Sequence, residues 1–157
     1  MILLLALLLA GERTVLGVWD RWGAFRDEDP ARCFAIAQPV DTAGRTDRSG
    51  AFASVATRVG PARRPAVFIR FAATRSERAP VTLAIGERRF ALAGALRSAR
   101  APDAATDRAI VGAMRGGRSM SVTTMTASGA PIADTYTLNG AATAIDAAAL
   151  ACARPHG

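Results

Sequence analysis

The chain has 157 residues, of which half are hydrophobic and 21% are charged. This length fits one domain, and this composition can bury a core, which excludes a chain that is disordered throughout. All 20 basic residues are arginine, and the formal net charge is +7. Alanine and glycine are abundant as well, and all three residue types are favoured by a high-GC coding bias. This bias explains the arginines better than selection for bidentate anion binding does.

The positive charge is concentrated in the middle of the chain. Residues 58–118 hold thirteen arginines and four acids, whereas the rest of the chain holds seven arginines and nine acids. This excess of positive charge creates an electrostatic field that raises the local concentration of anionic partners. Lipopolysaccharide phosphate, anionic lipid and nucleic acid all qualify on charge alone.

The chain begins with an apolar run, ILLLALLLA, at residues 2–10. Nine residues are too few to cross a bilayer as a helix, but they fit the apolar region of a secretory signal peptide. We therefore expect residues 1–10 to be a signal peptide and residues 11–157 to form one β-rich domain. No basic residue precedes the run and Leu8 is a poor cleavage-site residue, which a start codon placed too far downstream would explain. The rival interpretation is an apolar N-terminal strand.

Three aromatic residues follow at a spacing of three: Trp19, Trp22 and Phe25. The simplest interpretation is that they cover a core or a sheet, since each removes a large area from water. A sugar-stacking platform is the alternative.

Short alternating segments then predict strands at residues 32–40, 52–59 and 66–74. The clearest hairpin joins residues 81–85 to 88–92 through Gly86–Glu87, because a glycine in first position favours a two-residue turn.

The C-terminal third reads as helix, strand, turn, strand, helix. Asp103 or Thr106 can cap a helix that runs to about Arg115. A strand follows at residues 118–126, where a bulge near Thr123–Thr124 would bring Met125 into phase with Met120. After a second strand at residues 131–138, the alanine-rich residues 141–153 predict a helix. The expected fold is mainly β: an antiparallel β-sandwich-like single domain with two short α-helices, the second of them C-terminal.

The two cysteines lie far apart, with Cys33 in the first clear strand and Cys152 in the last helix. An exported chain meets an oxidising compartment, where a lone cysteine pair usually forms a disulfide. The bond would close a loop of about 120 residues and contribute roughly 4–5 kcal/mol in the chain-entropy model. Two unpaired core thiols are the alternative.

Four segments resemble the invasion-associated locus B family of bacterial exported proteins. They are WGAFRD at 22–27, RCFAIAQP at 32–39, AIVGAMRGGRSMSV at 109–122 and DTYTLNGAATAIDAAALAC at 134–152. The last resembles the family signature D-x-Y-S-L-x-G through Asp134, Tyr136, Leu138 and Gly140, with Thr137 in place of the usual serine. The resemblance implies an exported, mostly β domain at the cell envelope, and it brings no catalytic residues. Members are tied to host-cell invasion, yet they also occur in non-pathogens, so invasion is not their general activity.

The residues give little sign of catalysis. The single histidine, His156, is next to the C-terminus, and neither a clustered set of metal ligands nor a phosphate-binding glycine loop is present. We expect no enzymatic activity, no metal and no cofactor. Asp134 shares the apolar face of its strand, where a carboxylate needs a partner. We expect it to form a salt bridge to an arginine or to cap a turn. The alternative is a catalytic role for this carboxylate in a hydrolase. Tyr136 is expected to be half-buried with its hydroxyl hydrogen-bonded.

The expected function is a periplasmic or secreted cell-envelope protein that binds an unknown envelope or extracellular partner. The alternative is an anion-binding module for lipopolysaccharide, anionic lipid or nucleic acid, with nucleic acid the least expected of the three. Candidate anion-binding residues are the basic pairs Arg63–Arg64 and Arg88–Arg89, and Arg115 with Arg118 forms a further pair. No transmembrane helix is expected.

Overall fold

The computed structural model describes residues 11–29, 31–42, 50–58 and 64–153. These residues form one antiparallel sheet of eleven strands together with two helices. The elements, in chain order, are β1 (Arg13–Trp19), β2 (Trp22–Glu28), β3 (Ala31–Ala37), β4 (Asp41–Thr42), β5 (Phe52–Arg58), β6 (Pro65–Arg70), β7 (Val81–Ile85), β8 (Arg88–Gly94), β9 (Ser98–Arg100), α1 (Ala104–Gly116), β10 (Ser119–Met125), β11 (Pro131–Thr137) and α2 (Ala141–Ala153).

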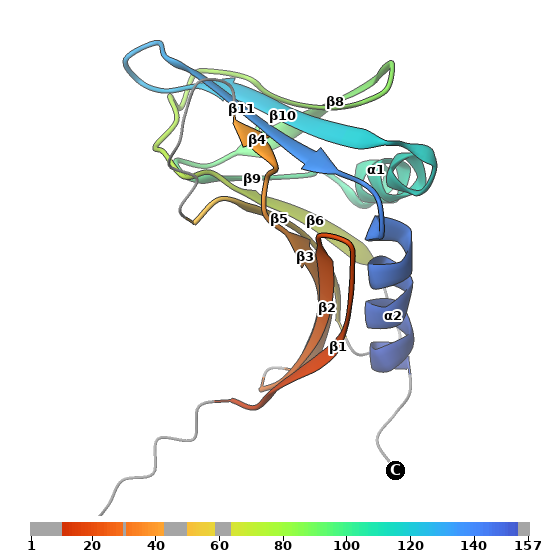
Figure 1. The fold of residues 1–157 in the computed structure, drawn as a ribbon. Helices are drawn as coiled ribbons and strands as arrows, with labels where there is room; N and C mark the ends of the chain where they lie inside the picture. The colour runs from red at the N-terminus through yellow and green to blue at the C-terminus, as the bar shows by residue number, and fades with distance from the viewer. Residues whose placement is uncertain (1–10, 30, 43–49, 59–63, 154–157) are drawn as a thin grey trace, which may run out of the picture.

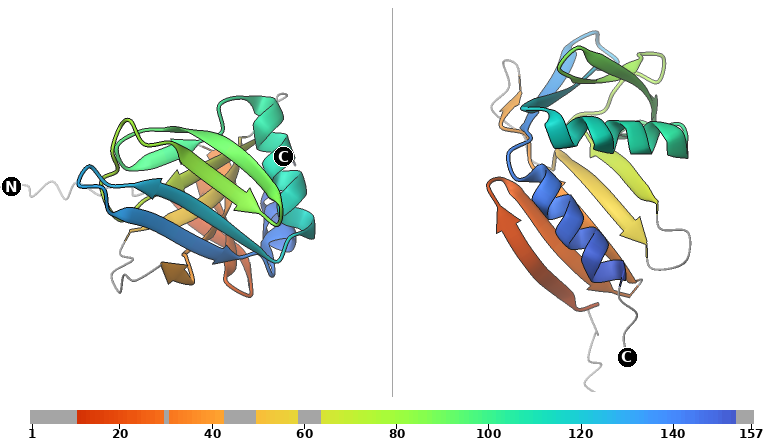
Figure 2. Two further views of the ribbon diagram at one scale, coloured as in Figure 1. Left: turned by 90° about the horizontal axis from the view of Figure 1, so that it is seen from above. Right: turned by 90° about the vertical axis from the view of Figure 1, so that its right-hand side faces the viewer.

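The strand order is β1-β2-β3-β5-β6-β9-β8-β7-β10-β11-β4, so the short strand β9 joins two halves of the sheet. β9 pairs with β6 on one side and with β8 on the other. The half made of β7, β8, β10 and β11 lies over the strongly curved half that begins with β1 (Figure 1). α1 lies where the two halves meet, and α2 packs against the curved half (Figure 2). The expected β-sandwich-like domain with a C-terminal second helix is confirmed.

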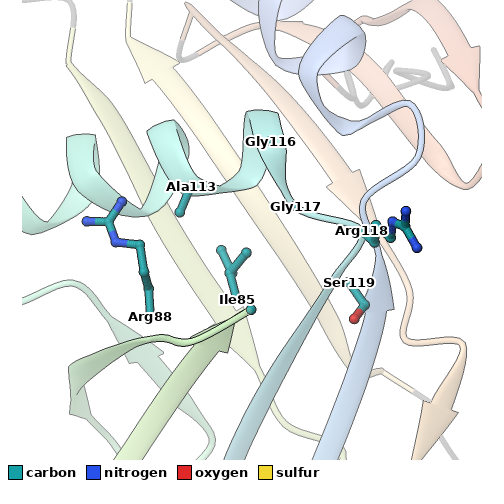
Figure 3. Close-up of a pocket in the computed structure, with 8 residues that line it drawn as sticks. Ile85, Arg88, Ala113, Gly116, Gly117, Arg118 and Ser119 are labelled. Atoms are coloured by element: carbon teal, nitrogen blue, oxygen red, sulfur yellow. The ribbon is translucent and has the colours of Figure 1, made fainter.

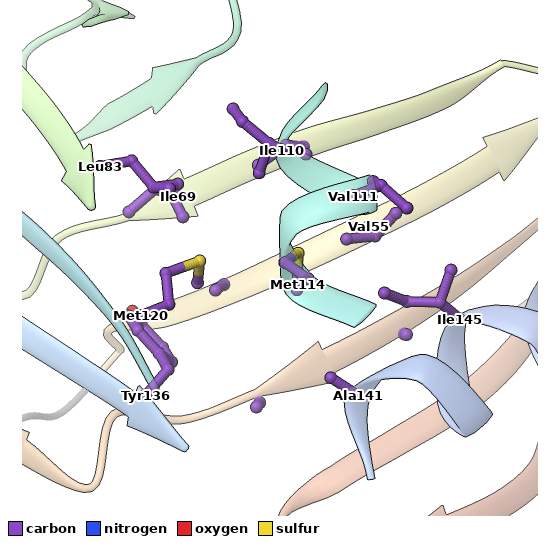
Figure 4. Packing of buried hydrophobic residues seen from close by; sticks show 14 of the residues in the cluster. Val55, Ile69, Leu83, Ile110, Val111, Met114, Met120, Tyr136, Ala141 and Ile145 are labelled. Atoms are coloured by element: carbon purple, nitrogen blue, oxygen red, sulfur yellow. The ribbon is translucent and has the colours of Figure 1, made fainter. Parts of the chain in front are cut away.

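The core forms because alternate residues of each strand turn inward. β7 buries Val81, Leu83 and Ile85, as its alternating sequence predicts. Both helices add one apolar face each, with Ile110, Val111 and Met114 from α1 and small residues around Ile145 from α2 (Figure 4). α1 and α2 each have 13 residues, and neither described helix is long and apolar enough to span a membrane.

α1 begins where the sequence predicts. Asp103 is its N-cap, and the carboxylate accepts a hydrogen bond of 2.7 Å from the backbone N–H of Thr106. This bond lowers the pKa of Asp103. Asp107, in the first turn, accepts a 2.8 Å bond from the backbone N–H of Val67, which ties α1 to β6. Burial raises the pKa of the Asp107 carboxyl despite that bond.

The N-terminal aromatic segment forms the hairpin β1–β2, which the sequence patterns do not reveal. The turn places Asp20 in the left-handed region, with φ of 57°. Trp22 is fully buried, and its indole N–H donates a 2.7 Å hydrogen bond to the carbonyl oxygen of Thr137. The interpretation of Trp22 as a core residue is therefore confirmed.

The expectation about strand phase in β10 is wrong. β10 and β11 pair in unbroken register from Ser119↔Thr137 to Met125↔Pro131, so β10 has no bulge, and Met125 is 45% exposed. The irregularity lies instead in β1, between Val15 and Gly17. A short strand, β4, follows β3 in the chain and pairs with β11.

Candidate functional site

A disulfide joins the curved half of the sheet to the last helix. Cys33 of β3 and Cys152 of α2 are bonded, with Cα atoms 5.8 Å apart, and both residues are buried. The expected pairing is confirmed, and the alternative of two unpaired thiols is wrong. Arg26 of β2 adds a second tie, since its Nη1 donates a 2.7 Å hydrogen bond to the carbonyl oxygen of Ala151. The end of α2 is thus fastened to the sheet covalently and by a nearly buried guanidinium.

The signature residues Asp134, Tyr136, Leu138 and Gly140 pack inside the molecule. The first three are buried, and Asp134 and Tyr136 lie on the inner face of β11. Gly140 has φ of +83°, and a Cβ at this position would collide with the carbonyl oxygen of Trp19. Only glycine accepts this backbone conformation and this close approach without strain. The signature residues therefore lie where β11 ends and α2 begins, and they pack against the β1–β2 hairpin.

The environment of Tyr136 differs from the expectation of a half-buried, hydrogen-bonded side chain. Its side chain is fully buried beside Met120, its cross-strand neighbour (Figure 4), and its hydroxyl has no hydrogen-bond partner within the described ranges. Burial, and secondarily the charge of Asp134, raises the pKa of the phenol well above its usual range. The expectation is wrong because the two halves of the sheet close over this strand.

Asp134 is only 4% exposed, so it offers little surface to a substrate. Within the described residues, no group of three or more histidine, cysteine or acidic side chains is placed to hold a metal ion.

A buried arginine, Arg75, was not singled out by its sequence context. It is 3% exposed, and its guanidinium donates to the carbonyl oxygens of Ala95, at 3.0 Å, and of Ala79. A third, longer bond of 3.4 Å reaches Oγ1 of Thr124. A Cβ on Gly94 would lie 2.6 Å from its Nη1, so this glycine makes room for the cation. Arg75 therefore joins three segments that are remote in the chain.

The arginines expected to bind anions do not form one cluster. Arg88 and Arg89 are adjacent on β8, so their side chains point to opposite faces of the sheet. Arg88 shares its face with Phe90, over whose ring the guanidinium lies at 5.0 Å. Arg64 is exposed just before β6, and Arg63 lies outside the described residues. Of Arg64, Arg88 and Arg89, only Arg88 lines the pocket described next.

An open pocket of about 380 Å³ lies between the β7–β8 hairpin and the C-terminal end of α1 (Figure 3). Its lining consists of Ile85, Gly86, Arg88, Ala113, Gly116, Gly117, Arg118 and Ser119. Gly117 is required here, because a Cβ would lie 2.5 Å from Cγ2 of Ile85 and 3.0 Å from Cδ1 of Leu138. The lining thus combines small apolar residues and glycines with two arginines and one serine.

Arg118, rather than its sequence partner Arg115, is the second basic group of this pocket. Arg115 turns to Asp146 of α2, with Nη2 and Oδ1 2.7 Å apart, and this pairing lowers the pKa of Asp146. Neither Arg88 nor Arg118 forms an ion pair with any described residue. Sequence spacing alone does not separate Arg115 from Arg118, since it does not show which of them reaches α2.

The fold defines this chain as a small, disulfide-bonded, antiparallel β domain with two helices. It is similar to the crystal structure of invasion associated protein B from Bartonella henselae, with a TM-score of 0.65 and 19% sequence identity. The similarity covers 88% of this chain and 96% of that one. No protein-family model matches the sequence, and no curated protein matches it. The resemblance proposed from the sequence is confirmed at the level of the fold.

Proposed function

We propose that this chain is an exported cell-envelope protein of the invasion-associated locus B type, which acts by binding a partner and not by catalysis. The observation that carries the proposal is the buried Cys33–Cys152 disulfide, whose cysteines are 119 residues apart. Structural disulfides persist in oxidising compartments and are scarce in the reducing cytosol. The apolar run at residues 2–10, which lies outside the described residues, supplies a leader for export.

The side chains around the pocket support binding over catalysis. General acid–base chemistry needs a group that can take up and release a proton near neutral pH, positioned at the substrate. The pocket lining contains two arginines and one serine but neither a carboxylate nor a histidine. Arginine keeps its proton at neutral pH, so these groups can hold an anion but do not shuttle protons.

Mass spectrometry of protein purified from cell fractions tests the proposal. We expect envelope or secreted material to lack residues 1–10 and to have the intact mass of a chain lighter by two hydrogens, the mark of the disulfide. Protein that keeps residues 1–10 and both free thiols in the cytoplasmic fraction would contradict export. A partner that co-purifies with the envelope material would then be tested for direct binding.

The pocket also favours a second candidate function, a module that binds small anionic groups. Two arginines line this pocket, and neither forms an ion pair with a described residue; guanidinium groups suit the bidentate recognition of phosphate or carboxylate. The carbonyl groups at the C-terminal end of α1 disfavour an anion, so it would sit on the arginine side of the pocket. Lipid phosphate and acidic surface polymers share this chemistry.

Salt elution from heparin tests this second candidate. Arg88→Ser with Arg118→Ser should elute at clearly lower salt than wild type. The control, Arg89→Ser with Arg108→Ser, removes the same charge from exposed positions outside the pocket lining. Equal shifts for both double variants would mean that only net charge matters, and the pocket would be rejected as an anion site.

A further inference from the structure

The sheet has one long free edge, at β1. The strand order begins with β1, which pairs with β2 on one side and with no other described strand. β1 has seven residues, whereas the strand at the other edge, β4, has two. β1 lies at the outer margin of the curved half (Figure 2). A free edge of this length presents a row of backbone N–H and C=O groups that can pair with another strand.

Exposed apolar side chains accompany this edge. Val15 and Val18 are 61% and 65% exposed, although β-branched residues of this kind pack well when a neighbouring strand covers them. They pair with Phe25 and Gly23 of β2, which share one face of the sheet. The bulge between Val15 and Gly17 therefore brings two valines that are three residues apart onto the same face.

We propose that two copies of this chain pair along β1, antiparallel, about a two-fold axis between Leu16 and Gly17. In this register Val15 of each copy lies opposite the partner's Val18, and the sheet continues from one copy into the next. The contact is isologous, so each valine pair forms twice.

The charges at the two ends of β1 select this register. Arg13, near the start of β1, lies at the same end of the strand pair as the partner's Asp20, the first residue of the β1–β2 turn, so an arginine and an aspartate meet at each end of the pair. Opposite charges at facing positions of an antiparallel pair are stabilising. A slip by two residues would place Arg13 opposite a valine and separate the valine pairs. In the single chain Arg13 binds Asp27 of β2, with Nε and Oδ1 2.7 Å apart, so in the dimer its guanidinium has to bridge or turn towards the partner's Asp20.

The interface is small. One strand pair buries less surface than the roughly 1,200–2,000 Å² of a stable complex, so we expect a weak dimer that forms at high local concentration.

Cysteine cross-linking tests the register directly, with Val15→Cys and Val18→Cys made as separate full-length variants. An equal mixture should form disulfide-linked dimers under mild oxidation, because facing residues lie within about 4.5–5.5 Å. Either variant alone should cross-link far less, because Val15 and Val18 face β2 residues two positions apart, which makes its two cysteines diagonal neighbours about 7–8 Å apart. That distance is at or beyond the roughly 7 Å limit for a disulfide. The native cysteines are buried and bonded to each other, so they should not interfere.

Cross-linking that is absent from the mixture, or equally strong in either variant alone, would overturn the proposed register. Light scattering across a concentration series measures the association itself. Val15→Lys with Val18→Lys should need at least tenfold more protein to dimerise than wild type. Met125→Lys, a substitution at an exposed position on β10, should not change the midpoint. Wild-type protein that stays monomeric at every concentration, or dimers that are insensitive to the valine substitutions, would overturn the proposal.

Discussion

Removing the disulfide tests how far one covalent bond supports this domain. Cys33→Ala with Cys152→Ala frees two residues that are 119 positions apart. For a loop of that length the chain-entropy model gives a stabilisation of about 5 kcal/mol. A domain of this size has roughly 5–15 kcal/mol in total, so the variant should be marginally folded. α2 should be the first element to loosen, because isolated helices of about 12–15 residues are marginal in water.

Urea unfolding followed by tryptophan fluorescence measures the effect, since Trp22 is fully buried and exposed only on unfolding. Wild-type protein under a reductant that opens the bond is the matched control, because it keeps both sulfur atoms and isolates the cross-link from the loss of side-chain volume. Both samples should lose similar stability, with the double variant slightly lower. A loss below about 1 kcal/mol in both would refute the reasoning, since it would mean that the unfolded chain is compact without the bond.

Three further predictions follow from buried groups. Arg75→Met should lower the free energy of unfolding by about 1–3 kcal/mol in the same assay, because it removes the hydrogen bonds that a buried guanidinium donates to two part-buried carbonyl oxygens; a loss under 1 kcal/mol would show that water replaces the guanidinium. Gly140→Ala should destabilise more than Gly129→Ala, because both glycines have left-handed φ but only position 140 meets backbone atoms of Trp19; equal losses would show that the close approach relaxes. Tyr136 is the sole tyrosine, and burial raises its pKa, so folding favours its neutral phenol: this stability should be fully present below about pH 10 and be lost as pH rises above it. Tyrosinate absorbance should therefore appear only together with unfolding, and its appearance in folded protein near pH 10 would contradict this.

Local patterns of the sequence determined much of the fold. The alternation at Val81–Ile85, the turn at Gly86 and the cap at Asp103 each depend on neighbours within a few residues, and all three are present. The cysteine count, together with the apolar N-terminal run, was sufficient to predict the disulfide. These features could be read because the atoms that decide them are close in the chain.

The tertiary structure alone decided the candidate site. Arg88 and Arg118 both line one pocket because the β7–β8 hairpin lies beside the C-terminal end of α1, whereas Arg115 pairs with Asp146 of α2. Residue spacing carries no information about such contacts. The burial of Arg75 and the depth of Tyr136 likewise depend on how β9 joins the two halves of the sheet, which brings together strands far apart in the sequence.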